Sequence, residues 1–592
     1  MNKQKIACVL CPGWANLPPI ALAYIKGASH ELKIDCFDFN SELIKKRFND
    51  FNKIFDPPFN DIRPFMFNNI DFTEFENALI VYENNYSSFI DECEQKVKDY
   101  NLVGFTIYQN NIIPSIALAK RLKKRYGTYT IAGGPSLNMD NNIFLEYVVK
   151  NKIIDVGVKG IAEDIISDLI QKILSNQDLS KIPRLVFLKD GKELFYTKNA
   201  DPDLSKFSPP NYDDFNFNDY FSDRKNVISI YANIGCMGNC EFCTIREMYP
   251  TFLSKPINNI KQEMDFLFNK YGLNHFFFSD SMFLGNAKDA LELFQYAIEK
   301  NYKLGIQIRM APYWDNEELV KSASKCLYFL QIGLESLSPN VRKSMRKMVS
   351  QEKTEKILDL FLKFSLPIYL NIITGYPNEA DEDFFTTYNF LKKNLKKLIG
   401  IGLNSFFIPN NFPSDKYGIN YDENGYWRSN VVNIEKRVER IYLLCDLAQK
   451  CGLDKSFMYG FDNVEGVPLK NSSINENCNY SNIKYINNRW LNPIRAGYVD
   501  SIKKIGENTV LLQGWGVKPT INIPFDAIIV MKENNILAYS TDRYERIDVA
   551  QAVSEKCRDS GFIMRFNSSS LEGLKVYCLD NNEKVAYLLP HS

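Results

Sequence analysis

Three cysteines stand close together in the stretch IGCMGNCEFC, residues 234–243, at the spacing C-x3-C-x2-C. An apolar run that we expect to form a strand precedes them, and the stretch itself is polar and contains glycine, which is typical of a loop. Because thiolates are strong metal ligands, three of them in one loop indicate a metal site at Cys236, Cys240 and Cys243. The fold must therefore place this loop where a metal group can act.

Three explanations fit three neighbouring thiols. A structural zinc site needs four protein ligands, and no second C-x2-C pair or Cys/His pair follows at a usable spacing. Thiols can also fall together by chance, since cysteine is common in protein cores. A [4Fe–4S] cluster held by three cysteines leaves one iron open for a substrate or cofactor. The spacing favours the cluster, with zinc and chance as the alternatives.

The composition narrows the class of protein. Lys+Arg and Asp+Glu both total 71 in 592 residues, which argues against nucleic acid or an anionic membrane as a partner. Thirteen scattered cysteines indicate reduced thiols rather than a disulfide framework, and three histidines argue against histidine-based catalysis. We find no secretory signal and no apolar run near the roughly 18 residues of a membrane span. We therefore expect a soluble, cytoplasmic protein.

Short apolar runs alternate with amphipathic stretches over the first 185 residues. A helix is expected over 111–127, because Ile112, Ile116, Ala119 and Leu122 share one stripe and Gly127 can end it. This alternation predicts a doubly wound parallel sheet with a ligand crevice at the carboxyl ends of its strands. The expected strands cover residues 6–11, 34–39, 102–108, 129–134 and 154–160.

The alternation resumes from residue 226 in units of about 30 residues, which suggests a partial parallel (β/α)6 barrel. A helix is expected within 256–272, with Pro256 near its start and Gly272 at its end. Such barrels place their chemistry at the carboxyl ends of the strands, which is where the three cysteines fall. The expected strands are 227–235, 275–280, 305–310, 328–335, 368–375 and 399–407.

The fold class is therefore α/β, with a small antiparallel β domain at the C-terminal end. Alternating apolar and polar residues with polar turns predict that last domain. The expected boundaries are 1–185 for the doubly wound domain, 186–225 for a linker, 226–407 for the barrel, 408–490 for a helical and loop extension, and 491–592 for the β domain.

The cysteine pattern, with Phe242 before its last cysteine and a barrel around it, resembles the radical S-adenosylmethionine superfamily. The resemblance implies that Cys236, Cys240 and Cys243 bind a [4Fe–4S] cluster, whose open iron chelates S-adenosylmethionine. IGLES, residues 332–336, resembles the family's glycine–glutamate segment, which implies that Gly333 and Glu335 lie near the cofactor or substrate.

Further stretches match the family by position. IITGYPNEADEDF, residues 372–384, resembles its G-x-P-x-E-x-x-x-D run, which implies that Gly375 backs the adenosine. FFFSDSMF and IQIRMAP occupy places where family members offer Asp280 and Arg309 to the cofactor or substrate. The resemblance covers roughly residues 226–400. As an alternative, Glu335 and Arg309 form a structural salt bridge at the barrel mouth.

The first 185 residues resemble the Rossmann-like cobalamin-binding domain of one radical subclass. Gly160–Glu163 reads GIAE where the family has G-E-x-E, and the D-x-H-x-x-G motif of other cobalamin proteins is absent. The alternative is a domain of this fold that has lost its ligand. The residues implied to contact cobalamin are Thr106, Tyr108, Gln109, Gly133, Gly134, Gly160 and Glu163.

The resemblance implies a radical enzyme that cleaves S-adenosylmethionine and, with cobalamin, methylates an unactivated carbon of a natural-product or cofactor intermediate. The substrate is expected to be a small molecule or a group linked to a carrier or peptide, and the electron donor a flavodoxin or ferredoxin. Alternatives are a radical cyclase or rearrangement enzyme without methylation, methyl transfer without radical initiation, and a non-catalytic metal-binding protein.

Four aromatic residues and two segments complete the candidates. Tyr108, Tyr249 and Tyr376 are possible hydrogen donors by location, and the linker and residues 408–490 are possible lids. Trp515, between two glycines, is either a buried aromatic beside a turn or part of a recognition surface.

Overall fold

The computed structural model describes the chain apart from residues 1–3, 14–17, 48–71, 139–142, 221–226, 348, 410–411, 422–426, 452, 454–457, 461–483, 487–496, 505–508, 519–522, 533–534, 542, 547–548, 551–554, 581–584 and 590–592. The fold divides into two compact units. The first unit contains residues 1–371 with two short later segments, and the second contains most of the remainder. Each unit is described by itself.

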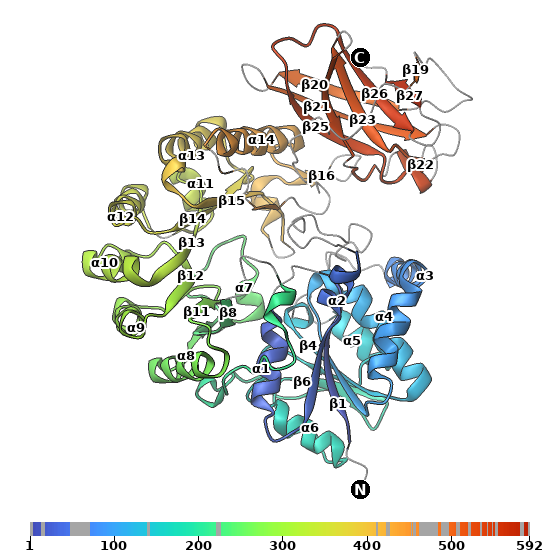
Figure 1. The fold of residues 1–592 in the computed structure, drawn as a ribbon, viewed down its shortest axis with the longest axis vertical. Coiled ribbons are helices and arrows are strands. Elements are labelled where there is room, and N and C mark those ends of the chain that lie inside the picture. The colour runs from blue at the N-terminus through green and yellow to red at the C-terminus, as the bar shows by residue number, and fades with distance from the viewer. Residues whose placement is uncertain are drawn as a thin grey trace. The chain divides into compact units, whose positions relative to one another are not determined.

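The first unit begins with a seven-stranded sheet in the order β2-β1-β3-β4-β5-β6-β7 (Figure 1). Strands β1 to β5 are parallel, as the sequence predicts, and their order reverses between β1 and β3. In doubly wound sheets this reversal marks the ligand crevice. The strands are β1 (Ile6–Leu10), β2 (Ile34–Asp38), β3 (Leu102–Thr106), β4 (Tyr129–Gly133), β5 (Val156–Val158), β6 (Leu185–Lys189) and β7 (Glu193–Tyr196).

The sheet extends past residue 185, where the expected domain ends. Strands β6 and β7 form an antiparallel hairpin that joins the edge of β5. The sequence analysis missed β7 because its four residues are at least partly exposed on both faces and follow polar turn residues, so that they carry no apolar run. The domain therefore includes part of the expected linker.

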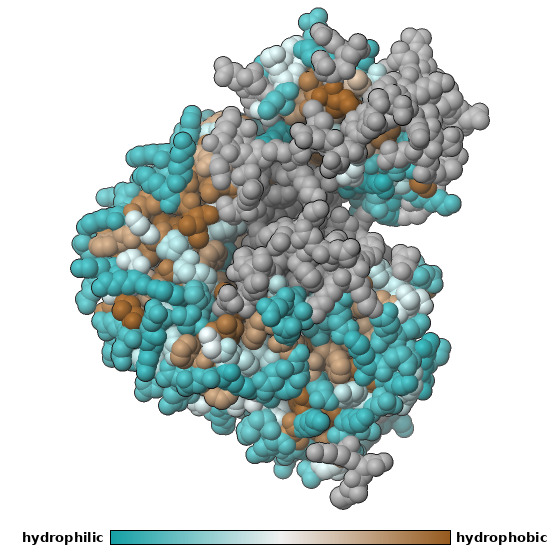
Figure 2. All heavy atoms as spheres, viewed as in Figure 1, coloured by the Kyte–Doolittle hydropathy of each residue, from teal (hydrophilic) through white to brown (hydrophobic). Residues whose placement is uncertain are grey.

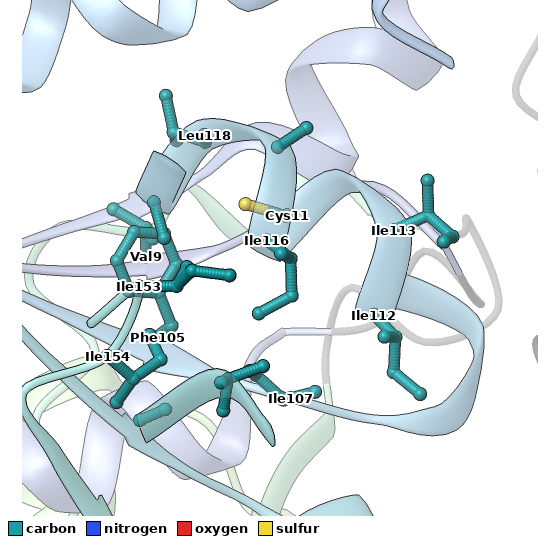
Figure 3. Close-up of a cluster of buried hydrophobic side chains, with 14 of the residues drawn as sticks. Val9, Cys11, Phe105, Ile107, Ile112, Ile113, Ile116, Leu118, Ile153 and Ile154 are labelled. Carbon is teal, nitrogen blue, oxygen red and sulfur yellow. The ribbon is translucent and has the colours of Figure 1, made fainter. Parts of the chain in front are cut away.

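Helices cover both faces of this sheet. Helix α4 carries the expected apolar stripe and ends at Gly127 in the left-handed conformation, with φ +66°. Figure 3 shows Ile116 of α4 in one apolar cluster with Val9 and Phe105 of the sheet, and all three are buried. The helices are α1 (Ile20–Ala28), α2 (Phe39–Arg47), α3 (Phe72–Val97), α4 (Ile112–Tyr126), α5 (Ile143–Lys150) and α6 (Ile166–Leu174), with short 3-10 turns η2 (Gln109–Asn111) and η3 (Pro135–Asn138).

A second sheet has the strand order β18-β15-β14-β13-β12-β11-β8. It contains the six strands expected for the barrel, and β18 pairs in parallel with β15 as a seventh strand. Residues 458–460 thus form a strand within the expected helical and loop extension of residues 408–490. The strands are β8 (Val227–Ile230), β11 (His275–Phe278), β12 (Lys303–Arg309), β13 (Leu327–Glu335), β14 (Ile368–Thr374), β15 (Gly400–Ser405) and β18 (Met458–Gly460).

In the first unit, helices α8, α9, α10 and α12 lie on one side of the sheet (Figure 1). Helix α8 starts after Pro256 and ends at Gly272, as predicted. Apolar side chains of these helices pack onto the strands: Phe278 of β11 contacts Phe283, whose ring stacks on Phe294 of α9. The helices are α7 (Ile245–Met248), α8 (Ile257–Tyr271), α9 (Ala287–Lys300), α10 (Glu317–Cys326), α11 (Pro339–Ser344) and α12 (Gln351–Lys363), and the second unit adds α13 (Asp381–Asn394) and α14 (Ile434–Lys450).

The C-terminal part consists of two sheets around one apolar core, in agreement with the expected β domain. Val510, Ile528, Phe562 and Val576 come from both sheets and share this core. Pairing is antiparallel except between β19 and β27, and β19 precedes the expected boundary at 491. The strands are β19 (Lys484–Ile486), β20 (Gly497–Lys504), β21 (Thr509–Lys518), β22 (Ile523–Pro524), β23 (Ala527–Lys532), β24 (Asn535–Ser540), β25 (Gly561–Asn567), β26 (Leu574–Asp580) and β27 (Val585–Leu588).

Two shorter hairpins complete the described strands. They are β9 (Asn233–Ile234) with β10 (Leu253–Ser254), and β16 (Asn420–Tyr421) with β17 (Trp427–Arg428). In the view of Figure 2, hydrophilic residues cover much of the described surface, with apolar areas between them. Within the described part of the chain, no helix has the length and apolar character needed to cross a membrane.

Candidate active site

The cysteine loop leaves the sheet through the short hairpin of β9 and β10 and leads into helix α7. Gly235 starts it in the left-handed region, φ +77°, where a Cβ would lie 2.5 Å from the carbonyl oxygen of Thr251. The hairpin thus requires glycine immediately before Cys236. All three cysteines, Cys236, Cys240 and Cys243, are partly exposed, as ligands that must reach a bound group need to be.

The loop geometry suits a polynuclear group better than a single ion. Among the residues that the structure describes, no three His, Cys, Asp or Glu side chains lie close enough together to hold one metal ion. Zinc requires thiolates that converge at about 2.3 Å on one centre, whereas the thiolates of a [4Fe–4S] cluster can each bind a separate iron. The Cys236 Sγ accepts a hydrogen bond from the Gly238 N–H at 3.3 Å, which stabilises a thiolate. The loop therefore fits the cluster.

The pKa of Cys243 shows how the loop would favour metal binding. Burial raises the pKa of this thiol, and the other two cysteines raise it further, while the cation of Lys347 lowers it. Three thiolates repel one another in the absence of a metal, so a cationic group bound between them relieves that repulsion.

Lys347 joins the cysteine loop to the end of β13. Its Nζ lies 3.2 Å from the Glu335 Oε1 and 5.6 Å from the centre of the Phe242 ring. It also donates a hydrogen bond to the Gly333 carbonyl oxygen at 3.1 Å. Three residues that the sequence analysis singled out, Phe242, Gly333 and Glu335, therefore meet around one lysine that it did not identify.

Glu335 has a strained backbone. Its φ is +67°, in the left-handed region that costs a residue other than glycine of order 1 kcal/mol or more. A Cβ on Gly333 would lie 2.9 Å from the Glu335 Oε1, so only glycine there leaves room for this carboxylate. Strain of this kind persists where the surrounding structure requires one side-chain direction, which supports a functional role for Glu335.

Arg309 at the end of β12 contacts the cysteine loop. A Cβ on Gly238 would lie 2.8 Å from an Nη atom of Arg309, so the guanidinium rests against the loop backbone. Among the described side chains, the ion-pair partner of Glu335 is Lys347, so the alternative of a structural salt bridge between Glu335 and Arg309 is wrong.

Asp280 is buried beneath the start of the cysteine loop. Its carboxylate accepts hydrogen bonds from the backbone N–H groups of Ala232 and Asn233, both at 2.9 Å. Burial raises its pKa to about 7, although these hydrogen bonds and the charge of Lys255 oppose the shift. The observed contacts position the loop; a role toward the cofactor stays a prediction.

Gly375 belongs to the second unit. Its φ is +77°, and a Cβ there would lie 2.5 Å from Cγ of Arg437. Its N–H donates to Glu379 at 2.6 Å, and buried Glu379 pairs with buried Arg440 at 2.9 Å. Burial raises the pKa of Glu379 to about 7 despite the nearby Arg440. The predicted G-x-P-x-E run is thus a turn held by its own glutamate, and its contact with adenosine stays a prediction.

The residues expected to contact cobalamin gather at the carboxyl ends of β3, β4 and β5. Thr106, Tyr108 and Glu163 are partly exposed there. Burial raises the pKa of the Tyr108 hydroxyl, a hydrogen bond with Thr106 opposes this, and Glu163 raises it further. Gln109 begins η2, and its side chain lies outside the described ones.

The glycines at this edge divide into two kinds. Gly134, at φ +113°, packs on the backbone of Ile107, where a Cβ would lie 2.5 Å from its carbonyl oxygen. Among the described residues, Val158 alone comes within 4.0 Å of a Cβ position on Gly133, which leaves space for a ligand in this part of the structure. Gly160 turns the chain after β5 at φ +78°. Gly13, which the sequence analysis did not select, is as crowded as Gly134, since a Cβ would lie 2.5 Å from the Asn110 carbonyl oxygen. The edge thus offers polar groups and space to a bulky ligand.

The cysteine loop lies beside this edge within the first unit. Helix α7, directly after Cys243, contacts η3, directly after Gly134. Tyr249, at the end of α7, interacts electrostatically with Glu163 and Tyr108. The sites implied for the two metal cofactors therefore adjoin.

A buried polar cluster joins helix α1 to the second sheet. The Lys255 Nζ lies 2.6 Å from a Glu263 carboxylate oxygen, and the Tyr24 hydroxyl donates to the other oxygen. The Tyr24 ring stacks on Tyr231 with centroids 4.9 Å apart. This cluster, Tyr24–Lys255–Glu263, fixes the two sheets of the first unit to each other.

Two further aromatic candidates lie in the second unit. Trp515 packs against Val517, Val549 and Cys557, which favours the explanation of a packed aromatic. Tyr376 is fully buried between Phe406 and Tyr417.

The comparisons with known proteins agree with this site. Residues 230–391 match the family model of the Radical SAM superfamily, so this part of the chain is a radical SAM domain. That family uses a [4Fe–4S] cluster and S-adenosylmethionine. An uncharacterized methyltransferase of Pyrococcus horikoshii is 22% identical over 306 residues, which are 50% of this chain and 64% of that protein. The chain thus spans less than two thirds of this relative.

Two solved structures share the fold. The radical S-adenosylmethionine methyltransferase TsrM from Kitasatospora setae superimposes with a TM-score of 0.51 at 14% identity, over 68% of this chain and 73% of that one. The cobalamin-dependent S-adenosylmethionine radical enzyme OxsB, solved with aqua-cobalamin and S-adenosylmethionine, superimposes with a TM-score of 0.50 at 12% identity, over 76% of this chain and 56% of that one.

Proposed function

We propose that the chain is a cobalamin-dependent radical S-adenosylmethionine enzyme that methylates an unactivated carbon of a natural-product or cofactor intermediate. The observation that carries the proposal is the contact between α7 and η3. It brings a three-cysteine loop of a radical S-adenosylmethionine domain next to the carboxyl edge of a doubly wound sheet. TsrM, whose structure shares the fold over 68% of this chain, was solved with cobalamin and a [4Fe–4S] cluster.

When bound, the cluster and S-adenosylmethionine supply a carbon-centred radical that removes hydrogen from the substrate, and cobalamin supplies a methyl group. Cys236, Cys240 and Cys243 would hold the cluster. Lys347 favours the thiolate of Cys243 and holds the Glu335 carboxylate at 3.2 Å. Glu335 therefore offers a fixed acceptor for an ammonium or hydroxyl group, which is the positioning role we assign to it.

Thr106, Tyr108 and Glu163 would bind the polar periphery of cobalamin, while Gly133 would admit it to the sheet edge. Gly133 leaves open space, whereas Gly134 is occupied by the backbone of Ile107, which shapes the floor of the site. The described part of this edge has no histidine, so the side chains that would hold cobalamin are the hydroxyl and carboxylate groups named above.

We propose a small molecule, or a group attached to a carrier or peptide, as the substrate. A flavodoxin or ferredoxin in the cytoplasm would supply electrons, in keeping with described cysteines that are all free thiols.

The test is anaerobic incubation of the reconstituted protein with reductant and methyl-labelled S-adenosylmethionine. We expect 5′-deoxyadenosine in the wild type and none in Cys240→Ala. Labelled methyl in a product supports methylation, and 5′-deoxyadenosine with an unlabelled product supports a radical cyclase or rearrangement enzyme instead. Methylated product without 5′-deoxyadenosine indicates methyl transfer without a radical. No 5′-deoxyadenosine and no methylated product under any condition contradicts the proposal.

A further inference from the structure

The two faces of the second sheet differ in burial. Leu304, Ile306 and Ile308 of β12 are nearly inaccessible, at 0 to 4% exposed. Phe276 on the matching side of β11 contacts Tyr302, and Phe278 packs toward α9, so this is the helix-covered face. If apolar side chains of another segment covered the opposite face of these central strands, the side chains on that face would be equally buried. Several are partly exposed, so solvent reaches this inner face.

Three side-chain amides lie at one level of the inner face. Gln307 of β12 is directly opposite Gln331 of β13 in the sheet register. The Gln331 Nε2 donates to the Asn371 Oδ1 of β14 at 3.1 Å. All three are partly exposed, although they stand in the middle of strands. We call Gln307, Gln331 and Asn371 the amide belt.

The belt has aromatic residues on one side and the candidate active site on the other. Two residues earlier along the strands, Phe277, Phe329 and Tyr369 form a row with centroids 6.1 and 5.5 Å apart. Two residues later, Arg309 stands opposite Gly333 at the cysteine loop. Two residues of a strand span roughly 7 Å, so a molecule of ordinary size can contact all three levels.

The hydrogen-bonding capacity of the belt exceeds its internal use. Three amides carry three carbonyl oxygens and three NH2 groups. Among the residues that the structure describes, the hydrogen bond from Gln331 to Asn371 is the one that these side chains make. The belt contains no ionisable group, so it can satisfy a neutral ligand but cannot compensate the desolvation of a charged one.

We propose that the amide belt binds a neutral amide group of the substrate, with an attached apolar or aromatic group against Phe277, Phe329 and Tyr369. The amide C=O accepts from a belt NH2, and its N–H donates to a belt carbonyl oxygen. This inference rests on the proposed function, because it places the substrate on the inner face of the radical S-adenosylmethionine domain. It defines the substrate class as an uncharged amide, such as a carboxamide, lactam or peptide bond, next to an apolar body.

Matched probes test the belt without a known substrate. Benzamide, acetophenone and benzoate share a phenyl ring and differ in the attached group. Benzamide offers a hydrogen-bond donor and acceptor, acetophenone offers an acceptor alone, and benzoate carries a negative charge. We would measure their dissociation constants on the full-length reconstituted protein by ligand-observed nuclear magnetic resonance. Benzamide should bind about threefold to tenfold more tightly than acetophenone, because one neutral hydrogen bond contributes a difference of this size. Benzoate should bind most weakly of the three.

Variants locate the effect. Gln331→Leu should remove most of the preference for benzamide over acetophenone, and Gln295→Leu, an exposed glutamine on α9, should leave it unchanged. Gln307→Glu is a second variant of nearly the same shape, and it should shift the preference from benzamide to the cation benzamidine. Equal binding of benzamide and acetophenone by the wild type, or a preference that Gln331→Leu and Gln307→Glu both retain, overturns the proposal.

The proposed function fails separately. Formation of 5′-deoxyadenosine from S-adenosylmethionine and reductant alone is measured on the wild type, separately from the binding of the amide probes. A wild type that forms 5′-deoxyadenosine but binds benzamide no better than acetophenone contradicts the belt only. Amide preference without any 5′-deoxyadenosine contradicts the proposed function and leaves the belt supported.

Discussion

Replacement of Lys255 by methionine tests the buried cluster that joins the two sheets of the first unit. Lys255 and Glu263 are each 3% exposed, and their charged atoms are 2.6 Å apart. Lys255→Met removes the cation and leaves the Glu263 carboxylate buried, with the Tyr24 hydroxyl as its remaining neighbour in the cluster. Breaking a buried ion pair from one side costs about 3–5 kcal/mol, because an uncompensated charge stays in the interior.

The double variant Lys255→Met/Glu263→Leu separates the pair from the packing. Apolar replacement of both partners is often close to neutral, so we expect it to recover most of the lost stability. Lys261→Met is the matched control, on the helix α8 that carries Glu263. Its partner Glu292 lies 2.8 Å away, but this pair is 20% and 42% exposed, so its loss should cost about 0–1 kcal/mol.

Hydrogen exchange followed by mass spectrometry gives the assay, since it measures opening of α1 and α8 separately from the rest of a large chain. We expect Lys255→Met to reduce the opening free energy of both helices. A cost no larger than that of Lys261→Met, or a double variant less stable than Lys255→Met, would refute the reasoning.

Three further predictions concern the candidate active site. Cys240→Ala should lose bound iron and the visible absorbance of the cluster while its far-ultraviolet circular dichroism stays that of the wild type; retained iron would contradict the ligand set. Lys347→Met should weaken S-adenosylmethionine binding about tenfold in equilibrium dialysis, because Glu335 loses its positioning partner. Lys343→Met, which changes an exposed lysine on α11, should leave this affinity unchanged. If both variants weaken binding equally, Lys347 has no special role. Asp280 has a pKa raised by burial to about 7, so its contribution to stability is present at acidic pH and declines as the pH rises through about 7. The fall in melting temperature between pH 5.5 and 8.5 should therefore be smaller in Asp280→Asn than in the wild type, and an unchanged fall would show that Asp280 is not the titrating group.

Much of the first sheet could be predicted because its central parallel strands are largely buried. Runs such as IACVL and YTIAG are apolar throughout, which is the pattern of central parallel strands, and they are β1 and β4. Strands β7 and β18 were missed for the opposite reason. They are three or four residues long, so periodicity cannot identify them.

The candidate site was predictable where its residues are close together in the sequence. It was not predictable where residues far apart in the sequence meet in the fold. The three cysteines lie within eight positions, so their spacing alone indicates a site. Lys347 reaches Glu335 only because α11 turns the chain back over β13. The amide belt left a weak signal, one amide residue within each of the mainly apolar runs GIQIRM, FLQIGLE and YLNIITG, which gains meaning only from the strand register.

One spectroscopic measurement tests the central claim most directly. Electron paramagnetic resonance of the anaerobically reduced, reconstituted protein should show a [4Fe–4S] signal that changes when S-adenosylmethionine is added, because one iron has no thiolate ligand and binds the added molecule. Cys240→Ala should show no such signal. A wild-type spectrum that S-adenosylmethionine leaves unchanged, or a protein that binds zinc at the three cysteines, would contradict the account.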